Sequence, residues 1–320
     1  MINAVSMSSR VEKMIDENKG NNIEGFIHSV FDYACNIQIP DKDLIGLISK
    51  EYGDNPYSIS IDLPAGQTMK KLTMEQGMKV FINSRGIRSV NGAFYINLQD
   101  TISWDPTPPK EYGRLVNRSQ LKNNFRTIMR ILLEKGNFLG IGPLILDYPE
   151  IIEAFNFQDF QKNFKANHYS LFISPRIKDL IYGIIKDDQV LIKKLLVGIV
   201  GFGPGLTPSA DDLLVGLMAA LYYLGQYYNK DIKEIAHFKN SLDDELTSQT
   251  TIVSRQMLKA ATKGEFAKSI KELCIAMITT DNKKEIENTV LDAISLGSTS
   301  GTDTMVGLLL GAYIIREIYL

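Results

Sequence analysis

The stretch Gly201-Phe202-Gly203-Pro204-Gly205-Leu206-Thr207-Pro208-Ser209-Ala210-Asp211-Asp212 joins a turn to the start of a helix. Its three glycines and two prolines stop any helix or central strand from running through it. Thr207 or Ser209 can cap the helix that follows. Asp211 and Asp212 fall in its first turn, where carboxylates suit the positive end of the helix dipole. The positions that continue the apolar face at helical spacing are Leu213, Leu217, Ala220, Leu221 and Leu224.

A loop of this composition can also bind an anion. Glycine lets backbone N–H groups come close to a ligand, and a helix N-terminus attracts negative charge. The adjacent carboxylates of Asp211 and Asp212 are not needed for capping, but a hard cation such as Mg²⁺ uses them. Two interpretations follow: an anion and its metal share this loop, or the turn only packs tightly, since acidic residues in a first turn are also ordinary helix chemistry.

A second stretch, residues 297–308, again runs from glycine through threonine and a small residue to an aspartate and an apolar helix. Asp212 precedes Gly216 by the same spacing as Asp303 precedes Gly307. We therefore predict two helices whose N-termini point at one place. Small residues on both helices let their backbones pack closely, namely Gly216 and Ala220 on one and Gly307 and Gly311 on the other.

The composition is that of an ordinary globular protein. A chain of 320 residues is long enough for two domains, and a formal net charge of −2 argues against a nucleic-acid binder driven by bulk charge. Cys35 and Cys274 lie far apart in no metal-ligand spacing, which favours a reducing cytoplasm. Residues 1–15 lack the apolar core of a signal peptide. The apolar runs at 213–224 and 305–315 are shorter than the roughly 20 residues of a membrane span, which predicts buried helices.

The residues up to Pro109 are predicted to be rich in strands. Four short runs bounded by Gly, Asn, Asp or Pro have strand character, at residues 26–31, 57–63, 79–83 and 93–98. Asn91-Gly92 is a strong hairpin signal. Leu44, Leu47 and Ile48 share a helix face, which predicts a helix at about 41–51. The expected architecture is a small barrel or sandwich.

A connector at residues 104–109, Trp-Asp-Pro-Thr-Pro-Pro, separates this part from a helical one. The predicted helices span residues 121–135, 149–164, 175–185, 189–197, 213–228, 232–246 continuing to 261, 266–279, 284–296 and 303–319. Pro175 suits a first helical turn, and only residues 197–200 favour a strand. The sequence thus predicts an α+β protein, with a β-rich barrel or sandwich-like domain at 1–109. A larger all-α domain at 110–320 carries both glycine-rich motifs.

Several other kinds of site are disfavoured. Residues 195–203 imitate a dinucleotide-binding strand and turn, but Leu206 stands where the third glycine belongs and no strand ending in an acid follows. His28, His168 and His237 have no partner at ligand spacing, which argues against zinc. No Gly-x-Ser-x-Gly nucleophile elbow occurs.

Hydroxyl groups form a polar stripe at Thr247, Thr251 and Ser254 of the predicted helix that runs on to 261. The stripe is either a solvated face or a set of donors that faces the glycine-rich loop and binds a small polar substrate. The candidate anion-binding residues are Gly203, Gly205, Thr207, Ser209, Thr251, Ser254, Thr299, Ser300 and Gly301, and the candidate metal ligands are Asp211, Asp212 and Asp303.

Residues 203–212, GPGLTPSADD, resemble the signature G-x-G-L-T-P-S-G-D-D of the AllH-type family, long catalogued as a domain of unknown function. Ala210 stands where that family usually has glycine, and a small side chain is kept. Residues 297–309 resemble the family's C-terminal signature, and Ser29-Val30-Phe31 with Asn36 is similar to its N-terminal one. The resemblance spans nearly the whole chain.

The best-known member of that family is a subunit of oxamate carbamoyltransferase, which works with two further subunits, of the AllF and AllG type, in anaerobic allantoin breakdown and nitrogen metabolism. The resemblance implies a cytoplasmic subunit of an enzyme that moves a carbamoyl group between oxamate and phosphate, and it implies Mg²⁺. It leaves open which subunit holds the catalytic centre. Two alternatives stay open, a non-catalytic assembly or metabolite-sensing subunit and a stand-alone transferase or hydrolase of a small carboxylate. No nucleic-acid or membrane partner is expected.

Overall fold

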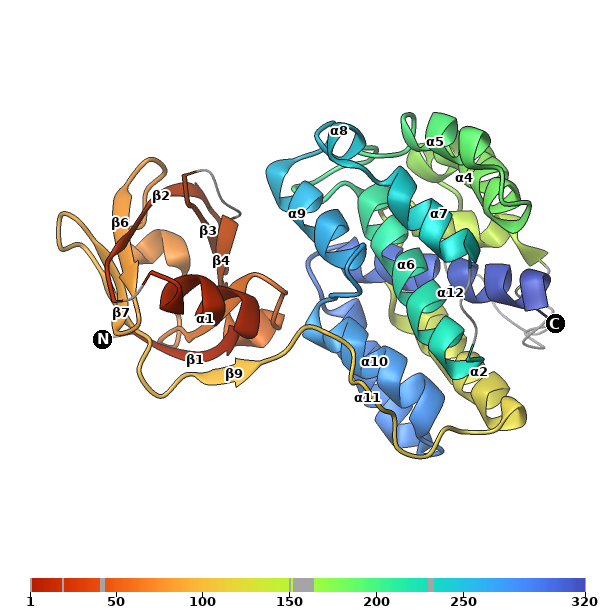
Figure 1. The fold of residues 1–320 in the computed structure, drawn as a ribbon, viewed down its shortest axis with the longest axis horizontal. Helices are drawn as coiled ribbons and strands as arrows, with labels where there is room; N and C mark the ends of the chain where they lie inside the picture. Colours follow the sequence, from red (N-terminus) through yellow and green to blue (C-terminus); the bar gives the residue numbers. More distant parts are fainter. Residues whose placement is uncertain are drawn as a thin grey trace. The chain divides into compact units, whose positions relative to one another are not determined.

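The computed structural model describes residues 2–18, 20–40, 44–149, 151, 164–229 and 233–319. The chain divides into two units, Met1–Pro108 and Pro109–Leu320, the first built mainly of strands and the second of helices (Figure 1). The predicted α+β class is therefore confirmed. None of the helices in the described part of the chain combines the length and the apolar character needed to cross a membrane.

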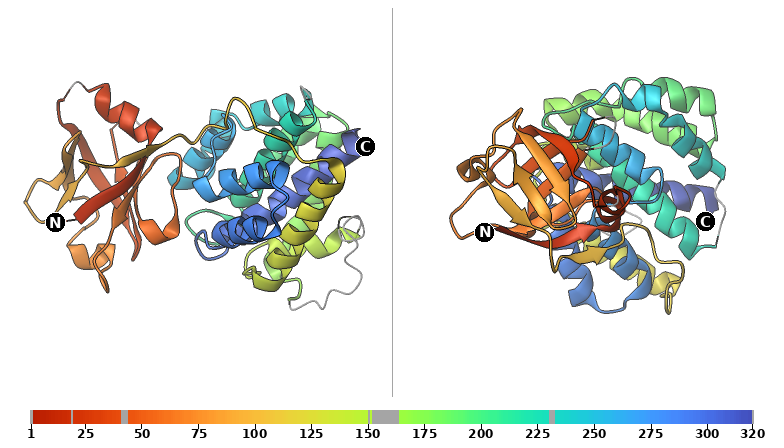
Figure 2. Two further views of the ribbon diagram at one scale, coloured as in Figure 1. Left: turned by 90° about the horizontal axis from the view of Figure 1, so that it is seen from below. Right: turned by 60° about the vertical axis from the view of Figure 1, so that its left-hand side comes forward.

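The N-terminal unit is a closed barrel, and not a sandwich. Eight strands follow the order β5-β4-β3-β2-β6-β7-β8-β1, and β1 pairs with β5 to close the ring (Figure 2). β9 extends the sheet by pairing with the second half of β1. Closure satisfies strand edges that would otherwise be exposed. The strands are β1 (Ile2–Ser8), β2 (Ile23–Val30), β3 (Ala34–Gln38), β4 (Leu44–Ser49), β5 (Ser58–Asp62), β6 (Lys79–Asn83), β7 (Gly86–Ser89), β8 (Tyr95–Asn97) and β9 (Ile102–Trp104).

The barrel core consists largely of β-branched side chains, and the fully buried ones include Ile37, Ile45, Ile59, Ile61, Val80, Ile82, Ile87 and Ile96. A short helix, α1 (Ser9–Asp16), follows β1. The predicted helix at 41–51 is wrong, since Leu44–Ser49 is strand β4 and only Lys50–Tyr52 forms a 3₁₀ turn. β4 lies between β3 and β5, and the hydrogen bonds and burial that it gains there outweigh the helical spacing of its leucines.

The C-terminal unit is all helical in its described part, as predicted. Its helices are α2 (Arg118–Lys135), η3 (Gly142–Asp147), α4 (His168–Ile185), α5 (Gln189–Leu196), α6 (Ser209–Tyr227), α7 (Lys233–Ser241), α8 (Asp244–Thr247), α9 (Ile252–Ala261), α10 (Lys268–Thr279), α11 (Lys283–Ile294) and α12 (Ser300–Tyr319). Most of the helix predicted at 149–164 lies outside the described residues.

Two helix predictions and one strand prediction need correction. Pro175 lies inside α4 and not in its first turn, because the capping box of Asn167 starts that helix earlier. The long helix predicted from 232 to 261 is three helices, since Asp243 and Thr251 each cap a new one. Residues 197–200 form a turn and not a strand.

α6 and α12 cross at the centre of the helical unit (Figure 1). Sixteen of the nineteen residues of α6 are buried, as expected of a helix that is apolar all round. A Cβ on Gly307 would lie 2.0 Å from the carbonyl oxygen of Leu213, and one on Gly311 would lie 2.7 Å from that of Leu217. The predicted close packing of these helices along their glycines is confirmed.

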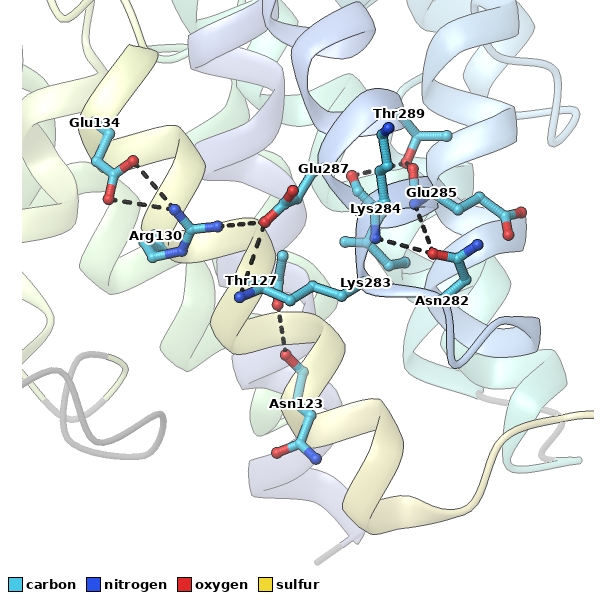
Figure 3. A network of polar contacts seen from close by, with 11 residues as sticks. Asn123, Thr127, Arg130, Glu134, Asn282, Lys283, Lys284, Glu285, Glu287 and Thr289 are labelled. Carbon is cyan, nitrogen blue, oxygen red and sulfur yellow. Dashed lines mark hydrogen bonds and ion pairs between the residues drawn. The ribbon is translucent and has the colours of Figure 1, made fainter.

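A polar network joins α2 to α11 on the surface of this unit (Figure 3). Arg130 of α2 contacts Glu287 of α11 at 2.7 Å and Glu134 at 3.3 Å, and Lys283 lies 3.9 Å from Glu287. Asn282 caps α11. The C-terminal end of α2 leads to residues 136–142, and that of α11 leads to the start of α12. The network therefore links the two helices that precede these segments.

Candidate functional site

The N-termini of α6 and α12 lie side by side. Thr207 Oγ1, in the loop before α6, and Ser300 Oγ, at the start of α12, share a hydrogen bond of 2.9 Å. Behind them, Gly216 and Thr304 bring the two backbones into contact. The predicted convergence of the two glycine-rich segments is therefore confirmed. The positive ends of two helix dipoles meet at this point.

Asp212 and Asp303 are buried beneath this junction, with 1% and 0% of their surface exposed. Asp303 Oδ1 accepts a hydrogen bond of 2.8 Å from the backbone N–H of Gly142. The Oδ2 atoms of both aspartates have no hydrogen-bond partner among the described residues. A buried carboxylate oxygen without a partner is strongly destabilising unless a proton or a cation satisfies it. The pair is thus suited to hold one or the other.

Both carboxyl groups are easier to protonate than an exposed aspartate. Burial and the nearby charge of Asp303 raise the pKa of Asp212 well above its ordinary value, and the hydroxyls of Ser300 and Thr207 oppose this rise. Burial also raises the pKa of Asp303 to about 6. Ser209 lies close enough to Asp303 to lower this pKa, although its Oγ makes no hydrogen bond of standard geometry in the described part of the chain.

Asp211 differs from Asp212 in that both of its carboxylate oxygens accept hydrogen bonds. Its Oδ1 accepts from the backbone N–H of Gly201 at 2.8 Å, and its Oδ2 accepts from the hydroxyls of Thr250 and Ser254 at 2.5 and 2.6 Å. Burial raises the pKa of this carboxyl, and these three donors lower it. Because both oxygens already accept hydrogen bonds, Asp211 fixes the glycine-rich loop to the start of α9.

The loop itself needs its glycines. Gly201, Gly203 and Gly205 have φ angles of +80°, +114° and +100°, which residues with side chains rarely adopt. The backbone N–H groups of Gly203 and Gly205 donate no hydrogen bond to any described residue. The loop at 204–206 is exposed, directly before the buried aspartates. It therefore carries backbone N–H groups without partners among the described residues, a few positions before Asp212.

The predicted cap of α6 is wrong. Pro208 occupies the N-cap position and no side chain caps the helix. The hydroxyl of Thr207 bonds to Ser300 instead. The first helical N–H groups of Asp211 and Asp212 are satisfied by the carbonyl oxygen of Pro208.

Two of the three residues of the predicted polar stripe, Thr251 and Ser254 at the start of α9, support the loop. Thr251 caps α9 and donates to the carbonyl oxygen of Leu206 at 2.6 Å. Ser254 is 1% exposed, so the solvated-face interpretation is wrong for it, and it reaches Asp211 as described above. Thr247 is also buried, but its hydroxyl donates to the carbonyl oxygen of Asp243 and does not reach the loop.

Of the predicted residues on the second segment, Thr299 lies beside Asp303 and Gly301 packs against another helix. Thr299 lies near enough to Asp303 to lower the pKa of that carboxyl by hydrogen bonding. Gly301 packs against α11, where a Cβ would lie 2.3 Å from the carbonyl oxygen of Ala293, and its N–H donates to Leu296. Gly301 therefore serves helix packing.

A third segment, which the sequence patterns above do not predict, lies against Asp303. Residues 136–142, here called the third loop, cover the carboxylate of Asp303. A Cβ on Gly140 would lie 2.2 Å from Asp303 Oδ2, and Asn137 N–H donates to Thr302 Oγ1 at 2.8 Å. One signal points to this loop, because Gly140-Ile141-Gly142-Pro143 repeats the pattern of Gly201-Phe202-Gly203-Pro204.

The donor set fits a hard cation. Asp212 and Asp303 supply carboxylate oxygens without partners, and hydroxyl groups lie beside them, which are ligands that Mg²⁺ accepts together with water. Within the described ranges, no three histidine, cysteine, aspartate or glutamate side chains are grouped to hold a metal ion. Of the three predicted aspartates, Asp212 and Asp303 each keep a carboxylate oxygen without a hydrogen-bond partner in the described part of the chain, whereas both oxygens of Asp211 accept hydrogen bonds.

Comparison with known families assigns both units of the chain. Residues 3–103 match the AllH family N-terminal domain, and residues 199–312 match the oxamate carbamoyltransferase subunit AllH. The second match contains both helix N-termini of the site. No solved structure shows significant similarity to the chain. With the barrel and the helical unit both matched, the chain belongs to the AllH family.

Proposed function

We propose that this chain is a subunit of an enzyme of the oxamate carbamoyltransferase type, and that it binds a small anionic substrate together with Mg²⁺ where α6 and α12 begin. One observation carries the proposal. Two buried carboxylate oxygens, on Asp212 and Asp303, lack hydrogen-bond partners in the described part of the chain and lie below a loop with free N–H groups. Such a site attracts a cation in its interior and an anion at its rim.

The residues divide the work between them. Asp212 and Asp303 would hold the metal, and the N–H groups of Gly203 and Gly205 would donate to the anion. Thr207 and Ser300, whose hydroxyls already contact each other, would add side-chain donors between them. Bound Mg²⁺ would supply positive charge that neutralises a phosphate or carboxylate oxygen.

The proposed reaction moves a carbamoyl group between oxamate and phosphate. Both acceptors are anions, so the main tasks are to bring like charges together and to stabilise the charge of the transition state. Backbone N–H donors and two helix N-termini do this without moving a proton. We assign no general acid or base to this chain, and we propose that the enzyme works in the cytoplasm with two partner subunits of the AllF and AllG type.

The test compares Asp212→Asn with Asp292→Asn, whose carboxylate lies on the exposed face of α11. Mg²⁺ binding to the purified full chain is measured by calorimetry, and phosphate-dependent carbamoyl transfer is measured after assembly with the partner subunits. We expect Asp212→Asn to lose both while assembly persists, and Asp292→Asn to keep both.

Two results would contradict the proposal. If Asp211→Ala and Asp212→Ala both leave the assembled enzyme at full rate, the site is assigned wrongly. If the wild-type chain assembles with its partners and binds neither Mg²⁺ nor phosphate or oxamate, the alternative of a non-catalytic assembly subunit is favoured.

A further inference from the structure

The third loop, residues 136–142, is attached to α12 at both of its ends. At its start, Asn137 N–H donates to Thr302 Oγ1 at 2.8 Å, and Asn137 Nδ2 donates to the carbonyl oxygen of Ser298 at 3.0 Å. At its end, Gly142 N–H donates to Asp303 Oδ1 at 2.8 Å. The loop thus sets how the carboxylate of Asp303 is turned, and with it where Oδ2 points.

The middle of this loop is held by a side chain from another helix. Asn167, at the start of α4, donates from Nδ2 to the carbonyl oxygens of Gly140 at 2.7 Å and of Phe138 at 3.2 Å. Its Oδ1 accepts from Ser170 N–H at 2.9 Å, which caps α4. One amide group therefore performs two separate tasks, with its oxygen on the helix and its nitrogen on the loop.

We infer that Asn167 is a positioning residue of the site: its amide nitrogen holds the third loop so that Gly142 presents its N–H to Asp303 and leaves Asp303 Oδ2 available to a cation. The effect of Asn167 on cation binding rests on the proposed function, whereas its hold on the third loop rests on the hydrogen bonds alone. Groups that hydrogen-bond directly to a metal ligand, as Gly142 N–H does to Asp303, typically change metal affinity by 10- to 100-fold when they are lost.

The two tasks of Asn167 can be separated by one substitution. Aspartate caps a helix as well as asparagine does, so Asn167→Asp keeps the cap of α4. It loses the Nδ2 donor and turns a carboxylate oxygen toward the carbonyl oxygens of Phe138 and Gly140. The third loop should then be released while α4 stays capped.

Asn117 provides a matched control. It caps α2 in the same way, with Oδ1 accepting from Gln120 N–H at 2.9 Å, and its position is exposed. Asn117→Asp makes the same chemical change at a helix start that does not hold the third loop. Both variants are made in the full chain.

Two measurements are made on each variant. Hydrogen exchange of the peptide that spans the third loop reports whether the loop is held, and Mn²⁺ binding followed by electron paramagnetic resonance reports the site. For Asn167→Asp we expect exchange of the loop to be at least about tenfold faster and Mn²⁺ affinity to be about tenfold weaker or more. Asn117→Asp should leave both at the wild-type value.

The outcomes separate this inference from the proposed function. Unchanged loop exchange in Asn167→Asp overturns the inference, and so does faster exchange with unchanged Mn²⁺ affinity. If the wild-type chain binds no Mn²⁺ at all, the proposed function fails. In that case, faster loop exchange in Asn167→Asp alone would still support the positioning of the loop by Asn167.

Discussion

A Cβ atom on Gly216 would lie 1.8 Å from the carbonyl oxygen of Thr304. Gly216 and Thr304 are both buried in their helices, so neither backbone can move aside without shifting a whole helix. We predict that Gly216→Ala lowers the free energy of unfolding, measured by urea denaturation, by at least about 3 kcal/mol, because the overpacking falls on backbone and not on a flexible side chain.

Gly183, inside α4, is the matched control. A Cβ there would meet its nearest neighbour, the side chain of Ile192, at 3.4 Å, which is ordinary contact. Gly183→Ala should change stability by less than about 1 kcal/mol or increase it, because alanine favours the helix. Equal losses in the two variants would show that α6 and α12 do not touch along their glycines.

The second prediction concerns pH. Burial raises the pKa of Asp303 from 3.8 to about 6, so between these values the folded protein binds a proton that the unfolded chain releases. The free energy of unfolding contributed by Asp303 therefore falls as the pH rises through this window, by on the order of 2 kcal/mol. Wild type and Asp303→Asn are compared by urea denaturation in EDTA between about pH 4 and pH 6. The free energy of unfolding of wild type, relative to that of Asp303→Asn, should fall as the pH rises. A difference that stays constant with pH would contradict the assignment.

The third prediction concerns the two cysteines, both free thiols buried in their units. Burial raises the pKa of Cys35 to about 12 and raises that of Cys274 as well. Because the thiolate is the reactive form, neither should react with a thiol reagent at pH 8 while the protein is folded. Mass spectrometry should find both labelled only after denaturation, and rapid labelling of either in the native chain would show that its unit opens locally.

The fourth prediction concerns the network of Figure 3. The side chains of Arg130 and Glu287 are 38% and 33% exposed, so water screens their contact. Glu287→Gln should lower stability by less than about 1 kcal/mol, and high salt should shrink that loss. A loss as large as that expected for Gly216→Ala would mean that the contact between α2 and α11 is not screened by water and is a major source of stability.

Short-range chemistry decided which parts of the structure could be predicted from the sequence. β6 begins and ends where the pattern of residues 79–83 predicts, since turn signals bound this short apolar run. In the folded strand, buried and partly buried side chains alternate. β4 was predicted as a helix because its apolar spacing suits both structures, and its partners β3 and β5 decide between them. Local patterns do not contain that pairing.

At the candidate site, too, local sequence patterns predict some residues and not others. Asp212 and Asp303 could be predicted because each follows a glycine-rich helix start with its own signature. Asn167 could not, since its role depends on carbonyl oxygens that lie 27 and 29 positions away in the sequence. An asparagine at a helix start predicts a cap, and only the folded chain shows what its nitrogen touches.

Strand β1 pairs with β5 along one edge and with β8 and then β9 along the other. The eight-stranded ring therefore stays open until β8 pairs with β1 through Ile96 and Asn97, far along the chain from Ile2 and Asn3. Until then β1 has an unsatisfied edge. Because the pairing of β1 with β8 joins strands that lie far apart in sequence, the barrel has high contact order and should fold slowly. An open strand edge is a template for wrong pairing, so the barrel is most prone to aggregate before β8 pairs with β1.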